Sequence, residues 1–140
     1  MKWHELDKTR LVLEFERIKK FYPSFQICKD EDNIAWEGAV SLIPEGINEP
    51  PLRIRIILGE GFPVVAPKIK PISPEIPEEV WGHQWHRWED GYLCYVKPHL
   101  WKVVYHITDI IEKAEMWYFN YLAYKHKLVD KMPDSGFAIL

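Results

Sequence analysis

The sequence predicts an α+β fold, in which helices flank a four-stranded antiparallel meander and a long loop separates the meander from the second helix. Two observations predict this fold. Apolar residues repeat with a helical period near both ends of the chain and with a period of two between them. The candidate strands follow one another and are joined by short turns, which favours an antiparallel meander over a parallel sheet.

The first predicted helix covers residues 3–22. Its apolar face follows the 3.6-residue period and is made of Leu11, Phe15, Ile18 and Tyr22, with Trp3, Leu6 and Leu13 broadening it. Pro23 ends the helix, because the residue before a proline is pushed out of the helical region. We expect the Leu11, Phe15 and Ile18 face to form part of the core.

Four strands are expected at residues 26–29, 34–43, 52–58 and 68–72. The third shows the cleanest alternation, with Leu52, Ile54, Ile56 and Leu58 facing inward between the outward Arg53 and Arg55. In the second, the inward side is expected to hold Ile34, Trp36, Val40 and Leu42, opposite Glu37 and Ser41. Turns at residues 30–33, 44–51 and 59–61 separate the strands.

No period holds from Pro71 to Trp101, whereas residues 107–128 predict the strongest helix. Loops of such length in a small domain are usually functional or disordered, and the density of Trp and Tyr favours an ordered, functional loop. Most of these aromatic residues are expected to hold the loop onto the sheet rather than to form a binding platform. The helix has one apolar stripe made of Ile107, Ile110, Ile111, Ala114, Tyr118, Tyr121 and Leu122.

Composition limits the possible classes of protein. The 140 residues, 47% of them hydrophobic, favour one domain over residues 1–140 with a loose tail at about 129–140. No apolar run approaches the roughly 18–20 residues of a membrane span, and the charged N-terminus lacks the apolar region of a signal peptide. A net charge of −3 argues against nucleic-acid binding. We therefore expect a cytoplasmic protein without a nucleic-acid or membrane partner.

Two cysteines, Cys28 and Cys94, are expected to be reduced thiols in the cytosol. Cys94 lies in the long loop with His83, His86 and His99 near it in sequence, and a neighbouring imidazolium lowers the pKa of a nucleophilic thiol. The alternative is that Cys94 is a small buried apolar residue. Cys28 lies in a strand pattern with no polar cluster beside it, so we expect a structural thiol there.

Two other chemistries remain open for the loop. His83 and His86, in a His-x-x-His spacing, together with Cys94 supply three zinc-ligand types, although the second tight pair common in zinc sites is missing. A cysteine protease is the other alternative, because Glu89 and Asp90 lie close to the cysteine and histidines in sequence.

The motifs in this order resemble the ubiquitin-conjugating enzyme family over roughly residues 3–128. Pro63 and Pro67 bracket a turn before the fourth strand, as the Pro-x-x-Pro turn of the family does, with one more spacer residue. The segment Gly91-Tyr92-Leu93-Cys94 matches the Gly-x-[Ile/Leu]-Cys motif around the catalytic cysteine of the family. Trp101 then follows after a short loop and precedes the last helix, as a Trp does in the family.

The chain departs from eukaryotic members at one motif. They carry His-Pro-Asn upstream of the cysteine, whereas the only asparagines here are Asn33, Asn48 and Asn120, and residues 83–87 read His-Gln-Trp-His-Arg. This pattern, with one long helix after Trp101, is more similar to the minimal bacterial conjugating enzymes of antiphage operons.

The resemblance implies a cofactor-independent acyltransferase. Cys94 accepts the C-terminal glycine of a ubiquitin-like protein, or of a similarly processed protein such as a nucleotide cyclase, from a ubiquitin-activating-type enzyme. It then passes the acyl group from the thioester to a target-protein amine. His86, or less readily His83, would donate to the developing oxyanion or orient the loop. The alternatives are an inactive binding module of the same fold and an unrelated thiol enzyme or zinc-binding domain.

Overall fold

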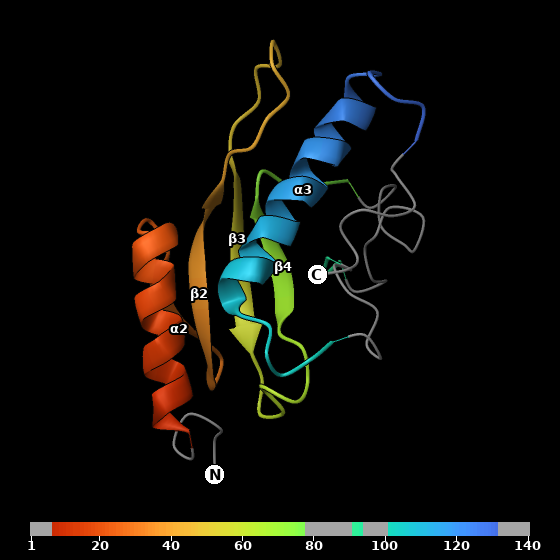
Figure 1. Ribbon diagram of the computed structural model, residues 1–140. Coiled ribbons are helices and arrows are strands. Elements are labelled where there is room, and N and C mark those ends of the chain that lie inside the picture. Colours follow the sequence, from red (N-terminus) through yellow and green to blue (C-terminus); the bar gives the residue numbers. More distant parts are fainter. Residues whose placement is uncertain (1–6, 78–90, 94–100, 132–140) are drawn as a thin grey trace.

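The computed structural model describes residues 7–77, 91–93 and 101–131 (Figure 1). These residues form an α+β arrangement in which one helix precedes four strands in the chain and another follows them. The elements, in chain order, are α2 (Lys8–Phe21), β1 (Gln26–Asp30), β2 (Asn33–Val40), β3 (Leu52–Leu58), β4 (Lys68–Ser73) and α3 (Ile107–Lys125). The predicted class and element order are confirmed for these residues.

The four strands form one antiparallel sheet in the order β1-β2-β3-β4. The register pairs Trp36 of β2 with Ile27 of β1 and with Ile56 of β3, and Ile56 in turn pairs with Ile69 of β4. A register shift interrupts the β3–β4 ladder between Arg53 and Ile54. Within the described chain, β1 and β4 are the two edge strands.

Both helices contribute to one core on the same face of the sheet. In Figure 1, α3 crosses in front of β3 and β4, and α2 lies beside β2. Ile18 of α2 and Ile110 of α3 belong to one buried cluster with Trp36, Ile54 and Ile56 of the sheet. The inward residues predicted for β3 are all buried, at 1% exposure or less, because side chains two apart in a strand share a face. The predicted stripe of α3 is buried throughout.

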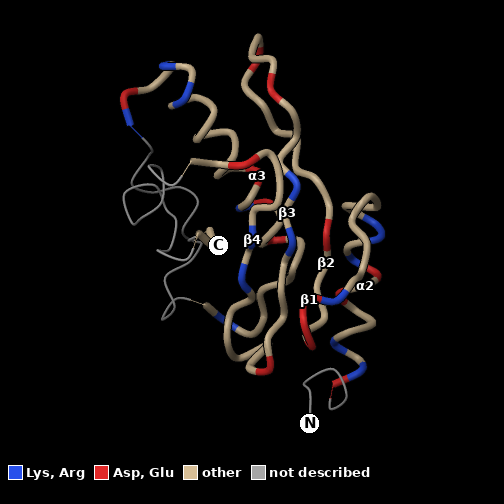
Figure 2. Tube along the Cα trace, turned by 180° about the vertical axis from the view of Figure 1, so that it is seen from behind, with Lys and Arg blue, Asp and Glu red and all other residues tan. Residues whose placement is uncertain are grey.

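Charged residues alternate with the buried ones along the strands, and Figure 2 marks their positions on the trace. Arg55 Nη1 lies 2.8 Å from Asp30 Oδ2, and Arg55 Nη2 lies 2.6 Å from Glu37 Oε1. Arg53 Nε lies 2.8 Å from the other oxygen of Glu37. Lys70 Nζ lies 3.9 Å from Asp30 Oδ2. These pairs connect all four strands, so charge complementarity follows the register of the sheet.

The buried face of the first helix differs from the prediction. Ile18 is buried and Leu11 is partly buried, but Phe15 is 41% exposed and Leu13 is 45% exposed. Glu14 is fully buried instead, at 0% exposure. The apolar pattern predicted the wrong buried face for this helix because it assumes that a charged residue points to solvent. Glu14 is instead buried together with polar hydrogen-bonding partners. Trp3 and Leu6 lie outside the described residues.

Two strand and helix ends also differ. The predicted second strand continued to residue 43, but β2 ends at Val40 and Leu42 is 47% exposed. The last helix ends at Lys125 rather than at residue 128, because the Leu128 N–H donates to Ala123 O and the Lys127 N–H to Tyr124 O. Lys127 has a φ of 62°, so these bonds form a Schellman motif that turns the chain out of the helix. Neither described helix has the length and apolarity that a membrane span requires.

Candidate active site

A short segment extends the sheet beyond its β4 edge. The Leu93 N–H donates to Ile69 O at 3.0 Å, and the two residues form an isolated antiparallel bridge. The Leu93 side chain is 2% exposed and belongs to the core cluster. The residue that precedes Cys94 in the sequence is therefore held by both a backbone hydrogen bond and apolar burial.

The two residues before Leu93 have defined roles in this segment. Gly91 has a φ of 90°, in the left-handed region that residues with a side chain rarely adopt. The Lys68 ammonium lies 5.2 Å from the centroid of the Tyr92 ring, a cation–π distance. The glycine of the Gly-x-Leu-Cys motif is thus required by backbone geometry, and Tyr92 adds a second attachment to β4.

The predicted catalytic residues Cys94, His86 and His83 lie outside the described residues, as do His99, Glu89 and Asp90. The zinc set that His83, His86 and Cys94 would form falls there too. Over residues 7–77, 91–93 and 101–131, no group of three or more His, Cys, Asp or Glu side chains is arranged to hold a metal ion. The described residues closest to Cys94 in the sequence are Gly91 to Leu93 and Trp101.

Trp101, on the C-terminal side of the Cys94 region, is attached to the turn between β3 and β4. Its indole Nε1 donates to Pro63 O at 2.8 Å, and its side chain is 9% exposed. The ring also meets Tyr105 edge to face, with centroids 5.6 Å apart and an interplanar angle of 67°. Two features that the sequence places 38 residues apart, the proline turn and the Trp, are therefore in direct contact.

Arg10 connects α2 to the segment that follows Trp101. Its guanidinium donates to Val103 O at 2.6 Å and to Tyr105 O at 2.7 Å. The same group lies 5.2 Å from the centroid of Phe62, in the β3–β4 turn. One arginine thus joins the β3–β4 turn to the segment that follows Trp101.

The buried carboxylate of Glu14 holds this arginine in place. Glu14 Oε1 accepts from Arg10 Nε at 3.0 Å and lies 3.0 Å from His106 Nδ1. The other oxygen, Oε2, accepts from the Ile107 N–H at 3.1 Å, at the start of α3. A carboxylate at a helix N-terminus is favoured by the helix dipole, and three donors compensate for the loss of hydration.

Sequence reasoning did not identify Arg10, Glu14 and His106. One signal was available: Arg10 and Glu14 are four residues apart, so their side chains meet on one helix face. Glu14 also interrupts the apolar face between Leu11 and Ile18, which is typical of a buried charge with a partner. The partners on α3 are more than 90 residues away, so no local pattern indicates them.

The β3–β4 turn and the segment after Trp101 expose aliphatic side chains. Val64 and Val65 of the β3–β4 turn are 74% and 61% exposed, and Val103 and Val104 are 46% and 68% exposed. The Trp101 and Arg10 contacts described above hold these two loops together. Each of the two loops therefore exposes a pair of consecutive valines to solvent.

Cys28 lies in β1, as predicted, where its side chain is half-buried on the charged face of the sheet. Burial raises the pKa of the Cys28 thiol, and the nearby carboxylates of Glu37 and Asp30 add to that effect against the opposing charge of Arg55. The expected lack of polar neighbours was wrong, because strand pairing brings in charges from β2 and β3. A raised thiol pKa disfavours the reactive thiolate.

Comparison of the chain with protein-family models, with curated proteins and with solved structures gives no match. A functional assignment therefore depends on the contacts of the β4 edge and on the residues next to it in sequence.

Proposed function

We propose that the chain is a bacterial ubiquitin-conjugating-type acyltransferase with the corresponding fold, which forms a thioester on Cys94. The observation that carries the proposal is the Leu93–Ile69 bridge. It attaches the motif residue before Cys94 to the edge of a four-stranded meander in a chain whose helix–meander–helix order matches the resemblance. We further propose a cytoplasmic protein that acts in antiphage defence.

The contact between Trp101 and Pro63 supports the same proposal. The resemblance rests on a proline turn, a Gly-x-Leu-Cys segment and a later Trp. The turn and the Trp bond to each other, while the Gly-x-Leu part pairs with the strand that follows the turn. If the matches to the family motifs were due to chance, the matching residues would not be expected to form one connected set of contacts.

In the first step, the Cys94 thiolate attacks the thioester carbonyl that joins the C-terminal glycine of the modifier to the activating enzyme. A new carbon–sulfur bond forms, the old one breaks, and the thiolate of the activating enzyme leaves. The step exchanges one thioester for another, so it needs no oxidant, reductant or cofactor on this chain.

In the second step, an amine of the target attacks the thioester on Cys94. A carbon–nitrogen bond forms, the carbon–sulfur bond breaks, the Cys94 thiolate leaves, and the nitrogen loses a proton to a base or to water. Negative charge develops on the carbonyl oxygen, so a hydrogen-bond donor positioned there accelerates this step. We assign this role to His86, with His83 as the second candidate.

A protein donor must dock before its acyl group can be transferred. Val64 and Val65 lie in the turn that leads into β4, and Val103 and Val104 follow Trp101, which bonds to that turn. We therefore assign the docking of the activating enzyme to these loops. Val64→Asp and Val104→Asp should each slow thioester formation while leaving the melting temperature within a few degrees of wild type, because both side chains are mostly exposed.

The decisive experiment loads the protein with the modifier, using an activating enzyme and modifier encoded beside it, together with ATP. Wild type should give a band on a nonreducing gel that a thiol reductant removes. Cys94→Ser should give a reductant-resistant oxyester, and Cys94→Ala should give no adduct. Cys28→Ala is the matched control and should load like wild type. An adduct on the Cys94→Ala protein would reject the covalent mechanism, and noncovalent capture of the modifier without any adduct would favour a binding module.

A further inference from the structure

Arg10 uses all three nitrogen atoms of its guanidinium to join separate parts of the chain. Its Nε donates to Glu14 Oε1 within α2, and its Nη1 and Nη2 donate to Val103 O and Tyr105 O. The two carbonyls belong to a segment that lies in no helix or strand, so no regular ladder pairs them. The planar fork of an arginine reaches all three acceptors at once, which the single ammonium of a lysine cannot do.

The same guanidinium contacts the β3–β4 turn. Its central carbon lies 5.2 Å from the centroid of the Phe62 ring, and Phe62 is buried. The turn also accepts the hydrogen bond from the Trp101 indole to Pro63 O. The segment after Trp101 is therefore held against the turn at two places, by its own indole and by Arg10.

A buried carboxylate fixes the position of Arg10. Glu14 is fully buried and accepts from Arg10 Nε and from the Ile107 N–H, and it lies 3.0 Å from His106 Nδ1. A carboxylate only accepts hydrogen bonds, so His106 Nδ1 carries the hydrogen in this contact. Moving the arginine away would leave a buried charge with fewer donors. The guanidinium is therefore held in place before any partner binds.

We propose that Arg10 is a positioning residue for thioester formation on Cys94: it fixes the segment after Trp101 against the β3–β4 turn, in the arrangement that the activating enzyme binds. The inference rests on the proposed function, which assigns docking to these two loops. A partner binds a surface that is already ordered more tightly than one that it must order. Loss of Arg10 therefore weakens docking and leaves the exchange of one thioester for another unchanged.

The experiment measures single-turnover transfer of the modifier to the full chain. The activating enzyme, carrying the modifier as a thioester, is in excess and its concentration is varied. Arg10→Ala should raise the half-saturating concentration by on the order of tenfold, while the rate at saturation stays near that of wild type. Arg10→Lys keeps the charge and the ion pair with Glu14 but loses the fork, so it should shift the half-saturating concentration in the same direction.

A second measurement does not involve the activating enzyme. The Trp101 indole N–H donates to Pro63 O and its side chain is 9% exposed, so its hydrogen should exchange slowly with solvent. Arg10→Ala and Arg10→Lys should each speed this exchange by on the order of tenfold, because the segment after Trp101 is released. Proton–nitrogen NMR spectra of the indole signals measure the rate, and Trp101→Phe identifies the signal among the seven Trp.

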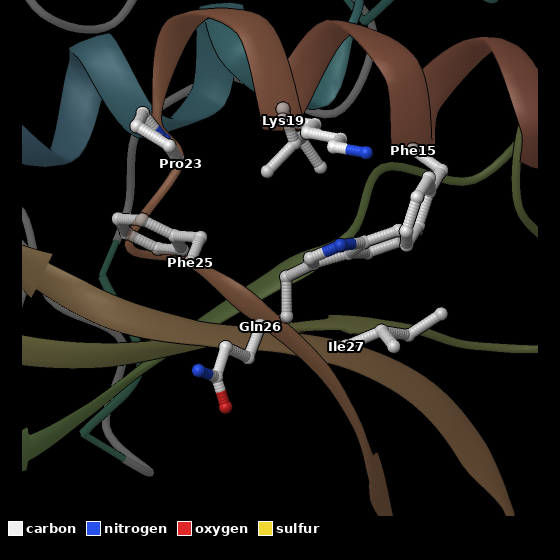
Figure 3. Close-up of a pocket in the computed structure, with 8 residues that line it drawn as sticks. Phe15, Lys19, Pro23, Phe25, Gln26 and Ile27 are labelled. Atoms are coloured by element: carbon white, nitrogen blue, oxygen red, sulfur yellow. The ribbon is translucent and has the colours of Figure 1, made fainter.

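A matched control for charge lies on the same helix. A groove between α2 and β1 has a volume of about 360 Å³ (Figure 3). It is lined by Phe15, Ile18, Lys19, Pro23, Phe25, Gln26, Ile27 and Trp36. Lys19 lies about 14 Å along the helix axis from Arg10. Lys19→Ala removes a cation from α2 without touching either loop, so loading and indole exchange should match wild type.

Arg55→Ala is the control for lost stability. Arg55 forms ion pairs with Asp30 and Glu37 on the sheet, away from both loops. Its removal should lower the melting temperature and leave the half-saturating concentration unchanged. A rise in that concentration equal to the rise in Arg10→Ala would assign the effect to stability and overturn the proposal.

The remaining outcomes separate this inference from the proposed function. If wild type forms no reductant-sensitive adduct, the proposed function is wrong and the role of Arg10 in it falls as well. If wild type loads and Arg10→Ala loads with the same half-saturating concentration, the proposed function stands and Arg10 has a structural role alone. Weaker docking with unchanged Trp101 exchange would show that Arg10 does not act through the two loops, which would also overturn the proposal.

Discussion

The two edge strands of the sheet, β1 and β4, differ in the residues that pair with them. At β4, the Leu93 N–H donates a hydrogen bond to Ile69 O, and the Leu93 side chain is buried. At β1, β2 is the one pairing partner among the described strands, and Ile27, which is 45% exposed, lines the groove between α2 and β1. The segment that precedes a cysteine in the sequence extends one edge, and the other edge is paired with β2 alone among the described residues.

This difference bears on the function proposed for the β4 side of the sheet. A reacting group must be held in a defined geometry, which a backbone hydrogen bond and a buried side chain provide. Each edge strand also has a cysteine associated with it: Cys28 within β1, and Cys94 directly after the residue bound to β4.

The largest expected effect compares the two cysteines. Cys94→Ala should abolish the reductant-sensitive adduct completely, because no sulfur remains to form the thioester. Cys28→Ala should leave loading unchanged, since burial holds the pKa of its thiol above the usual value. Loading assays on nonreducing gels measure both. Loss of the adduct in a folded Cys28→Ala protein would reverse the functions assigned to the two cysteines.

The next effect separates loading from transfer at the β4 side. His86→Ala should form the thioester normally, but its discharge to a free amine should slow by about 100–1000-fold, as is typical when one oxyanion donor is lost. A single-turnover chase with lysine measures the rate. His83→Ala is the matched variant and should retain most of the wild-type rate. Unchanged discharge in His86→Ala, with slow discharge in His83→Ala, would move the role to His83.

A pair of isoleucine variants compares the interior of the sheet with its β1 edge. Ile56→Ala in β3 should lower the free energy of unfolding by about 2–5 kcal/mol, because the side chain is fully buried. Ile27→Ala in β1 should lower it by about 1 kcal/mol or less, because nearly half of that side chain is already in water. Urea unfolding followed by circular dichroism measures both. Similar losses would mean that the β1 edge is covered in solution.

The smallest effect concerns the charged face that connects the two edges. Hydrogen bonds from Arg55 and Arg53 hold the pKa of Glu37 below its usual value. A lowered pKa in the folded state stabilises the protein above the unfolded-state pKa of about 4.3, and this stability is lost as the pH falls through the folded-state pKa.

Glu37→Gln should therefore lower the free energy of unfolding at neutral pH by about 0.2–1 kcal/mol, and the difference from wild type should shrink as the pH falls to about 3. Glu45→Gln, at an exposed residue without an ion pair to any described residue, should show no such difference at either pH. Chemical unfolding at a series of pH values tests the pair, and a constant difference across the series would contradict the assigned cause.

Much of the sheet and of the last helix was predictable because each has one strongly apolar face. The range of β3 was predicted to the residue, and the α3 stripe from Ile107 to Leu122 is buried as expected. The motif glycine, Gly91, was also visible in the sequence, and its positive φ supplies the physical reason for that residue type. In β3 and α3, the residues that are apolar in the sequence pattern are the ones that are buried in the fold.

The first helix shows where local chemistry is insufficient. Phe15 satisfies the helical period, but the groove beside β1 leaves it 41% exposed, while Glu14 is buried. The free energy of burying a carboxylate depends on its partners, and two of the three partners of Glu14 lie at the start of α3.

The sequence by itself therefore determined the order of the elements, the faces on which apolar residues dominate, and the motif around Cys94. The tertiary structure decided that Glu14 is inside, that Trp101 bonds to the β3–β4 turn, and that Leu93 pairs with β4, whereas β1 has β2 as its one strand partner among the described residues. The physical reason is the range of the interactions. The periodicity of the sequence reflects interactions within one helix or strand. Hydrogen bonds and ion pairs between distant segments form only when the fold brings their partners together.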